Sequence, residues 1–364
     1  MQGVQGFTFQ SHASRVLFGR GVLSQLRDEV QRFDARRVLV LCTPEQRESA
    51  EVVVRHLGDA AVGVFDRAVM HVPIEVAEEG REVAKKLRAD VVVAFGGGST
   101  IGLGKAIALV SDLPVMAIPT TYAGSEMTPI FGITEQGLKR TGRDLKVLPR
   151  TVLYDPELTL TLPVGLSVTS GINAIAHAAE GLYSRDANPV MSLMAEEGIR
   201  ALASGLPQIR TTPDDFAARS LALYGAWLCG SVLGNVGMSL HHKLCHTLGG
   251  SFNLPHAETH TVVLAHVLAF NANAAPEAMR RIERAMGVDN AAVGVYRLAI
   301  DNGAPRSLRE LGMKEEDVER AVRIAGDLPY WNPRTVDAAG LRSLLRNAYE
   351  GTPPKAPLRA TPAA

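Results

Sequence analysis

The sequence predicts a doubly wound α/β domain followed by an all-α domain. Three observations lead to this prediction. The chain has 364 residues, which is more than one small hydrophobic core usually holds. Short β-branched runs alternate with helical segments over residues 1–160, whereas segments with a period of about 3.6 residues fill residues 161–351. Residues 352–364 are rich in proline, which predicts a disordered tail.

Apolar runs in the first domain predict the strands of a parallel sheet. The run DVVVAF at 90–95 is nearly all apolar, as expected of a strand that helices cover on both faces. Comparable runs predict strands at 37–42, 61–65 and 116–118. Periodic charged segments between them predict helices at 46–56 and 75–88. Near the N-terminus, QGFTFQ and RVLF predict a hairpin whose edge invites pairing with another chain.

Helical periodicity dominates the second domain. Segments rich in Ala, Leu, Glu and Arg predict helices at 168–184, 189–203, 214–248, 258–273, 277–286, 291–302 and 315–327. The domain boundary is expected at 155–163, DPELTLTLP, where prolines bracket a turn-rich stretch.

The composition argues against several classes of partner. Lys and Arg together number 38, as do Asp and Glu, so the formal net charge is zero and no basic patch for nucleic acid or a membrane surface is expected. No apolar stretch reaches the ~20 residues that span a bilayer. The three cysteines, Cys42, Cys229 and Cys245, are scattered in apolar surroundings, which predicts buried, reduced thiols and a cytoplasmic protein.

Two loops of the first domain carry the residue types that bind a dinucleotide. The segment FGGGSTIGLGKAIAL follows a predicted strand and opens a helix, so that Gly96, Gly97, Gly98 and Ser99 can bring backbone N–H groups to a diphosphate. The segment IPTTYAGSEMT follows the next strand and offers Thr120, Thr121 and Ser125 to phosphate and ribose. An ordinary glycine turn and an ordinary Ser/Thr-rich turn are the alternatives.

The second domain contains a spacing of histidines that resembles a metal site. Asn173 and His177 are four residues apart, as are His242 and His246, and His256 follows. A spacing of four places two side chains on one face of a helix. A carboxylate in place of Asn173 would complete a site for zinc or iron, but a neutral amide is a poor ligand. We therefore expect this pocket to function without a metal.

Several motifs occur in one order across nearly the whole chain: GGGS, PTT-x-GSE, DPELT, G-x-N-A-x-A-H-A-x-E and H-x3-H-x3-GG-x4-LPH. Together they resemble the iron-containing (group III) alcohol dehydrogenase family and, within it, the maleylacetate reductase branch. The resemblance implies an N-terminal nicotinamide-dinucleotide-binding domain, an all-α C-terminal domain like that of dehydroquinate synthase, and a homodimer. It also implies NAD(P)H-dependent reduction of the conjugated C=C bond of maleylacetate to 3-oxoadipate in aromatic-compound degradation.

The resemblance also assigns roles to residues of this sequence. The family's metal ligands, one Asp and three His, correspond to Asn173, His177, His242 and His256, and His246 matches a histidine near the nicotinamide. Two departures resemble maleylacetate reductases rather than alcohol dehydrogenases. Gly102 stands where alcohol dehydrogenases usually carry Asp, and PTTYAGSE is shorter than the usual PTTAGTGSE.

The expected chemistry is hydride addition to the alkene carbon, with an enolate that hydrogen-bond donors stabilise. The residues expected to perform catalysis are His177, His242, His246 and His256. Those expected to bind the dicarboxylate substrate are Asn173, His177, His242, His256, Tyr122 and Lys243. Those expected to bind the cofactor are Thr43, Gly96, Gly97, Gly98, Ser99, Thr120, Thr121, Ser125, Lys146 and His246.

Thr43 bears on the choice of cofactor. It follows the strand at 37–42, where an acidic residue would repel the 2′-phosphate of NADPH. Because threonine is small and neutral, we expect both NADH and NADPH to be used. The alternatives to the reductase are a metal-dependent alcohol dehydrogenase of the same family, a lyase like dehydroquinate synthase, and a non-catalytic dinucleotide sensor.

Overall fold

The computed structural model describes residues 7, 9–12, 14–136, 138–327 and 330–355, which form two compact units. The α/β unit consists of Gln10–Leu162 and Pro213–Asn235, and the helical unit of Met1–Phe9, Pro163–Thr212 and Val236–Ala364. Most of the tail for which the sequence predicts disorder, residues 356–364, lies outside the described residues.

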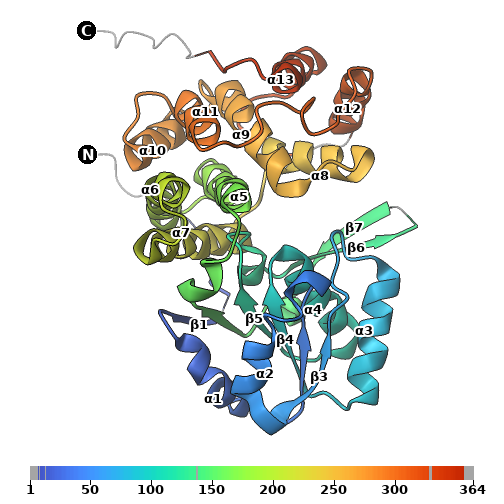
Figure 1. The fold of residues 1–364 in the computed structure, drawn as a ribbon. Coiled ribbons are helices and arrows are strands. Elements are labelled where there is room, and N and C mark those ends of the chain that lie inside the picture. Colours follow the sequence, from blue (N-terminus) through green and yellow to red (C-terminus); the bar gives the residue numbers. More distant parts are fainter. Residues whose placement is uncertain (1–6, 8, 13, 137, 328–329, 356–364) are drawn as a thin grey trace. The chain divides into compact units, whose positions relative to one another are not determined.

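Six parallel strands form the sheet of the α/β unit, in the order β1-β8-β5-β4-β2-β3 (Figure 1). The strands are β1 (Arg15–Phe18), β2 (Val38–Leu41), β3 (Ala61–Phe65), β4 (Val91–Gly96), β5 (Val115–Pro119) and β8 (Thr151–Tyr154). Successive residues of a strand point to opposite faces. Val38 and Val40 accordingly belong to one hydrophobic core, and Leu39 and Leu41 belong to another.

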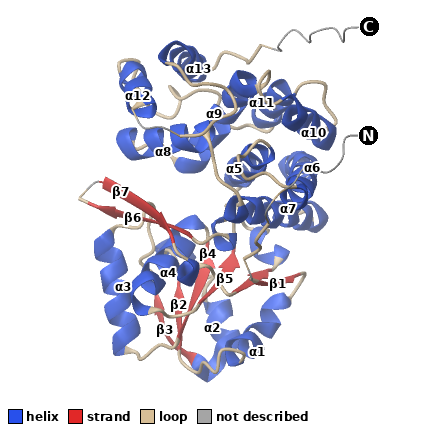
Figure 2. Ribbon diagram, turned by 180° about the vertical axis from the view of Figure 1, so that it is seen from behind, coloured by secondary structure: helices blue, strands red, loops and turns tan. Residues whose placement is uncertain are grey.

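Helices cover both faces of this sheet (Figure 2). Helices α1 (Leu26–Gln31) and α2 (Glu51–Leu57) contribute to the core that contains Val38, and α3 (Ile74–Lys86) and α4 (Gly98–Ser111) contribute to the core that contains Leu39. This is the doubly wound architecture that the sequence predicts.

Four strands differ from the prediction, and one of them, β8, was not predicted at all. The run RVLF forms β1, but β1 pairs in parallel with β8 at the edge of the sheet instead of forming a hairpin. Residues 7 and 9–12 form no strand, and the rest of the predicted first hairpin strand lies outside the described residues. An antiparallel pair, β6 (Ile130–Glu135) and β7 (Leu138–Arg143), was not predicted, because β7 reads LKRTGR and lacks apolar alternation.

Helix α7 (Phe216–Asn235) belongs to the α/β unit, which corrects the expected domain division. The sequence predicts one helix over 214–248 within the second domain, but the helix stops at Asn235 and α8 (Leu240–Phe252) starts after a short break. The buried Arg219 of α7 donates to the carbonyls of Pro213 at 2.8 Å and Leu162 at 2.9 Å. Although α7 is apolar enough to span a membrane, 61% of its most apolar window is buried in the protein.

The helical unit is built around α5 (Val164–Leu182) and α9 (His256–Asn271), which contact each other. Around them lie α6 (Pro189–Thr211), α8, α10 (Pro276–Met286), α11 (Ala291–Asp301), α12 (Asp317–Gly326) and α13 (Ala338–Glu350). Asn188, Asn290 and Asp337 cap α6, α11 and α13, because each side chain accepts from a backbone N–H in the first turn. Helix α13 was not predicted, α8 only overlaps the end of the predicted helix 214–248, and the other described helices of this unit match predicted segments.

The contact of α7 with the loop after β5 gives a stability prediction. A Cβ added at Gly234 would lie 2.3 Å from the carbonyl oxygen of Met127, whereas one added at Gly165 of α5 would meet nothing within 4 Å. We expect Gly234→Ala to lower the free energy of unfolding by about 2 kcal/mol, the cost of overpacking a tight contact. Gly165→Ala, the matched control, should raise it by up to about 1 kcal/mol. Urea unfolding measures both, and equal effects would contradict the packing described.

Candidate active site

Three polar side chains lie on one face of helix α5. Asn173, His177 and Glu180 are spaced at i, i+4 and i+7. Every residue of α5 from 167 to 182 is buried, so these three side chains lie inside the helical unit and need polar partners there. Helices α8 and α9 provide them.

His242 of α8 lies between His177 and Glu180. Its Nε2 atom is 2.8 Å from Nδ1 of His177, and its Nδ1 atom is 2.7 Å from Oε2 of Glu180. Both distances are those of hydrogen bonds. The three buried side chains therefore form one continuous hydrogen-bonded chain, which we call the Glu180–His242–His177 chain.

The other two histidines with predicted catalytic roles adjoin this chain. The ring of His246 is 6.3 Å from that of His242, measured between centroids. The ring of His256 is 4.4 Å from that of His260, which is itself 5.1 Å from His242. His246 is exposed and His256 is half-buried. The helical unit thus brings together all four histidines that the sequence singles out.

Asn173 bears on whether these residues fit a metal ion. The side chain is buried, and its Oδ1 atom has no hydrogen-bond partner among the described residues. A neutral amide binds zinc or iron weakly compared with a carboxylate. In addition, the facing ring nitrogens of His177 and His242 bond to each other. The residues present form a hydrogen-bonded polar cluster, and they lack the carboxylate that the resemblance assigns to the family's metal site.

A second pair of buried histidines, His241 and His260, adjoins the Glu180–His242–His177 chain. Nε2 of His241 is 2.9 Å from Nδ1 of His260 and 3.7 Å from Sγ of Cys245. Burial and the neighbouring imidazoles hold the pKa of both histidines well below the usual range, and burial raises the pKa of the thiol. The group is therefore uncharged, and His241 and His260 are buried core residues.

In the α/β unit, the two predicted cofactor loops meet at the carboxyl edge of the sheet. The first follows β4 and the second follows the neighbouring strand β5. The amide of Thr120 donates to the carbonyl of Gly96 at 3.1 Å. A Cβ at Gly97 would lie 2.9 Å from the side chain of Thr121, so a larger residue there would push the loops apart.

This arrangement fits the diphosphate of a nicotinamide dinucleotide. The backbone at Gly96 has a φ of 149°, which favours glycine. Helix α4 then starts at Gly98, and Ser99 lies in its first turn, where backbone N–H groups and the helix dipole favour an anion. Gly102 stands where the related alcohol dehydrogenases usually carry Asp. In this structure a Cβ at Gly102 would lie 2.9 Å from the side chain of Val72, so there is little room for a larger residue.

Two residues without a predicted role hold these loops in place. Lys105, in the otherwise apolar helix α4, is fully buried and donates to the carbonyl of Ser125 at 2.5 Å and to Oγ1 of Thr128 at 2.9 Å. Burial lowers the pKa of Lys105 to about 7. Gln46 donates to Oγ1 of Thr120 at 2.9 Å and so ties the loop after β2 to the loop after β5. The sequence signal that could have revealed the role of Lys105 is a single lysine within an otherwise apolar helix.

Thr43 and Ser125 lie where the sequence places them, at the ends of strands on this edge. Thr43 precedes the short turn Pro44–Gln46 after β2. The hydroxyl of Ser125 is 3.2 Å from the ammonium group of Lys105, so part of its hydrogen-bonding capacity serves the loop itself. In the helical unit, Lys243 lies on α8 with its ammonium group 6.0 Å from the ring centroid of Tyr330.

Two predicted site residues are placed elsewhere. Lys146 forms an ion pair with Asp112 at 3.5 Å, and Asp112 is the C-cap of α4. Because the 14 residues of α4 extend about 21 Å, Lys146 lies far from the glycine loop at the other end, and its prediction as a cofactor ligand is wrong. Tyr122 is fully buried beside Arg219 and Thr159, which indicates a packing role instead of contact with substrate.

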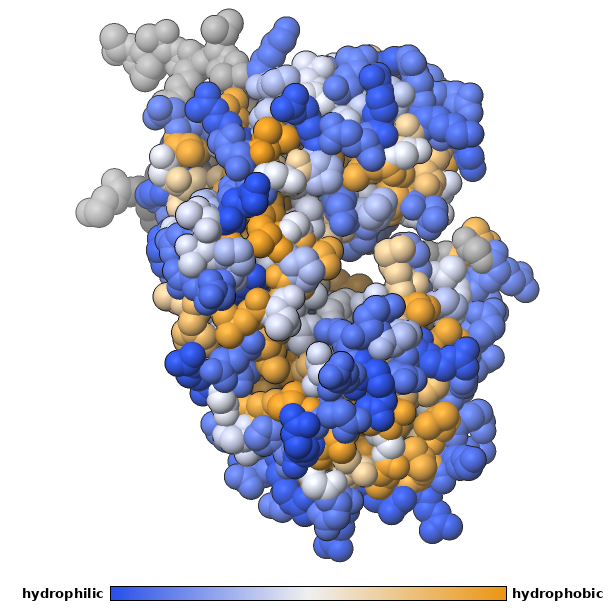
Figure 3. Space-filling model, viewed as in Figure 1, coloured by the Kyte–Doolittle hydropathy of each residue, from blue (hydrophilic) through white to orange (hydrophobic). Residues whose placement is uncertain are grey.

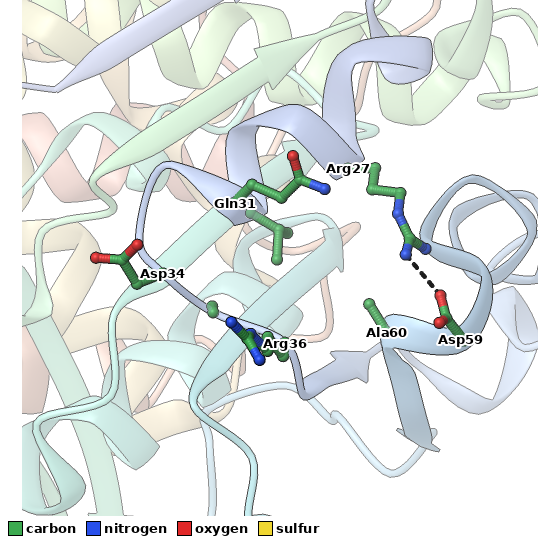
Figure 4. Close-up of a pocket in the computed structure, with 8 residues that line it drawn as sticks. Arg27, Gln31, Asp34, Arg36, Asp59 and Ala60 are labelled. Carbon is green, nitrogen blue, oxygen red and sulfur yellow. Dashed lines mark ion pairs between the residues drawn. The ribbon is translucent and has the colours of Figure 1, made fainter.

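A cavity of about 400 Å³ lies at the opposite edge of the sheet (Figure 4). Its lining includes Arg36 and Ala60, which lie just before β2 and β3, and Arg27, whose ion pair with Asp59 measures 2.6 Å. Ligands of open α/β sheets bind at the carboxyl ends of the strands. This cavity lies at the amino ends and is separate from the cofactor loops.

Comparison with known proteins agrees with this geometry. Residues 13–156 match the family described as iron-containing alcohol dehydrogenase, and residues 167–349 match the C-terminal domain of the Fe-containing alcohol dehydrogenase family. Maleylacetate reductase from Burkholderia cepacia is 58% identical over 96% of this chain and 100% of its own length. Maleylacetate reductase from Pseudomonas sp. strain P51 is 57% identical over 94% of this chain and 97% of its own.

A solved structure resembles the whole chain as well. The crystal structure of maleylacetate reductase from Agrobacterium tumefaciens is 50% identical, covers 96% of this chain and 100% of its own, and superposes with a TM-score of 0.93. The cofactor loops, the helical unit and these similarities agree, and the protein belongs to the iron-containing alcohol dehydrogenase family, whose members are NAD(P)-dependent oxidoreductases.

Proposed function

We propose that this protein reduces the conjugated carbon–carbon double bond of maleylacetate to give 3-oxoadipate, with NADH or NADPH as reductant, in the degradation of aromatic compounds. Relatives named maleylacetate reductase, which match the chain over nearly its whole length, support the reaction. The observation in the structure that carries the proposal is the buried cluster of histidines beside the neutral Asn173. Such a cluster suits a substrate with two carboxylates, because it has no aspartate at this position to repel them.

The reaction needs one hydride and one proton. The reduced nicotinamide supplies the hydride, which adds to the alkene carbon β to the ketone. The electrons of the double bond move toward the ketone oxygen, and the resulting enolate is stabilised by hydrogen-bond donors. We assign this role to the histidine cluster, a protonated member of which donates to the enolate oxygen and delivers the proton to the carbon next to the ketone.

We assign the binding roles from the same geometry. Substrate binding is assigned to Asn173, His177, His242 and His256. Cofactor binding is assigned to Thr43, Gly96, Gly97, Gly98, Ser99, Thr120 and Thr121, which lie on loops at one edge of the sheet. We further propose that the protein functions in the cytoplasm, because its three cysteines are buried and form no disulfide.

We also propose that catalysis proceeds without a metal. The support is the donor set, in which an amide replaces the carboxylate and two of the imidazoles are bonded to each other. A metal-dependent alcohol dehydrogenase of the same family is the second candidate function, since the chain belongs to that family.

Turnover with maleylacetate tests the reaction directly. We expect the absorbance of reduced nicotinamide to fall when maleylacetate is added, with both NADH and NADPH as donors. Dialysis against a strong chelator should leave this activity unchanged. Activity that is lost on chelation and restored by zinc or iron would overturn the metal-free proposal. Absence of nicotinamide oxidation with maleylacetate would overturn the reaction itself, and net oxidation excludes a lyase.

Restoring a carboxylate at position 173 tests the role of the neutral amide. We expect Asn173→Asp to bind zinc or iron more tightly, because the carboxylate is a hard anionic ligand. In the absence of metal, the new charge should repel the substrate and lower kcat/KM for maleylacetate at least tenfold, or about 1.4 kcal/mol. Asn173→Ala is the control, since it removes the amide without adding charge. Unchanged kcat/KM in metal-free Asn173→Asp would contradict this proposal.

We propose that the protein is a homodimer. Large hydrophobic side chains are exposed on the helical unit at Leu166, Val190 and Leu193, and Figure 3 shows hydrophobic patches among hydrophilic residues on one face of the molecule. Light scattering at micromolar concentration should give a mass of about twice 38.9 kDa. A mass equal to that of one chain would contradict the proposal.

A further inference from the structure

We propose that Glu180 is a positioning residue that fixes the tautomers of His242 and His177. This inference rests on the proposed function for its catalytic meaning, but its physical content concerns where two protons lie. Glu180 is the glutamate of the G-x-N-A-x-A-H-A-x-E motif, and neither the spacing of the histidines nor the proposed reaction assigns it a role.

The surroundings of Glu180 favour a side chain that accepts hydrogen bonds. Its Oε2 atom accepts from the amides of Ser239 at 2.9 Å and His242 at 3.3 Å, and its Oε1 atom accepts from the amide of His241 at 2.8 Å. The hydroxyl of Tyr183 also donates to Oε1, at 3.5 Å. The three backbone amides can only donate, and hydrogen bonds to the charged form of a carboxyl group favour that form. We therefore take the fully buried side chain as a carboxylate.

If Glu180 accepts, the direction of each hydrogen bond in the Glu180–His242–His177 chain is determined. Since Oε2 can only accept, the 2.7 Å contact requires a proton on Nδ1 of His242. The Nε2 atom of neutral His242 then carries a lone pair, so the 2.8 Å contact requires a proton on Nδ1 of His177. Both imidazoles are thus held as Nδ1–H tautomers. Buried carboxylates orient catalytic histidines in this way in unrelated enzymes.

Glu180 also has a second, purely structural task. The three amides that it accepts from belong to the start of α8, so a side chain of α5 satisfies donors that the helix leaves without intrahelical partners. Replacement of Glu180 will therefore lower stability as well as change the tautomers. A decisive experiment has to separate the two effects.

Nitrogen NMR of the native protein makes this separation, because it needs no substitution at Glu180. With ¹⁵N-labelled histidine, we expect the ring resonances of His242 and His177 to show protonated Nδ1 and unprotonated Nε2 at a pH where both rings are neutral. His242→Gln and His177→Gln assign the resonances. An Nε2–H tautomer at His242 would overturn the proposal. This readout involves no substrate, so it stands apart from a failure of maleylacetate turnover.

Two variants then connect the tautomers with catalysis. Glu180→Gln can turn its oxygen toward the three donors at Oε2, so we expect it to keep the Nδ1–H tautomer of His242 and to retain kcat within about tenfold. Glu180→Leu removes the acceptor, so the tautomers should mix and kcat should fall roughly a hundredfold, with little change in KM for maleylacetate. A folded Glu180→Leu variant with unchanged kcat, or with a loss confined to KM, would overturn the positioning role.

Asn290→Ala is the matched control for lost helix capping. Asn290 accepts from the amide of Val293 at 2.9 Å and caps α11 within the same helical unit. Its replacement should lower the thermal unfolding temperature without changing kcat or the nitrogen resonances of His242. If Asn290→Ala lowers kcat as far as Glu180→Leu does, the effect of Glu180 is explained by stability alone and the proposal fails.

Discussion

A helix that is buried along most of its length must pair every polar group that it carries, and α5 is such a helix. An unpaired buried polar group costs about 1–3 kcal/mol, which is a large share of the stability of a domain. His177 and Glu180 meet this requirement through His242 on a neighbouring helix. The same hydrogen bonds therefore hold α8 against α5 and fix the positions of the side chains in the site. Asn173 is the exception, because its Oδ1 atom has no hydrogen-bond partner among the described residues.

In the α/β unit, the buried polar group that needs partners is the amine of Lys105. Lys105 is buried within an apolar helix, and the oxygens that satisfy it come from the loop after β5. That loop is thereby fixed to the helix that opens at the glycine turn. Both cofactor loops derive their geometry from buried polar contacts as well as from the strands that precede them. Gly97 lets the two loops approach each other closely, and Lys105 holds the loop after β5 against α4.

The sequence predicted those features that depend on neighbours along the chain. The strands β2 to β5, the glycine turn before α4 and the one-face spacing of Asn173 and His177 are local patterns, and the structure contains each of them. The site features that were missed depend on contacts between distant residues. The role of Lys146 is wrong because its partner, Asp112, lies at the far end of α4. Glu180 was given no role, since the backbone amides and the imidazole that it contacts are 59 or more residues away.

The path of the chain between the two units has a consequence for biosynthesis. The α/β unit takes its last helix from 213–235, after the chain has already contributed residues 163–212 to the helical unit. A nascent chain that has emerged only as far as residue 162 lacks α7, whose Arg219 binds the carbonyl of Leu162. The α/β unit therefore cannot be completed on the ribosome before part of the other unit has been synthesised, in contrast to the usual order in which an N-terminal domain folds first. A protein with this connectivity cannot be divided into two autonomous fragments by a single cut.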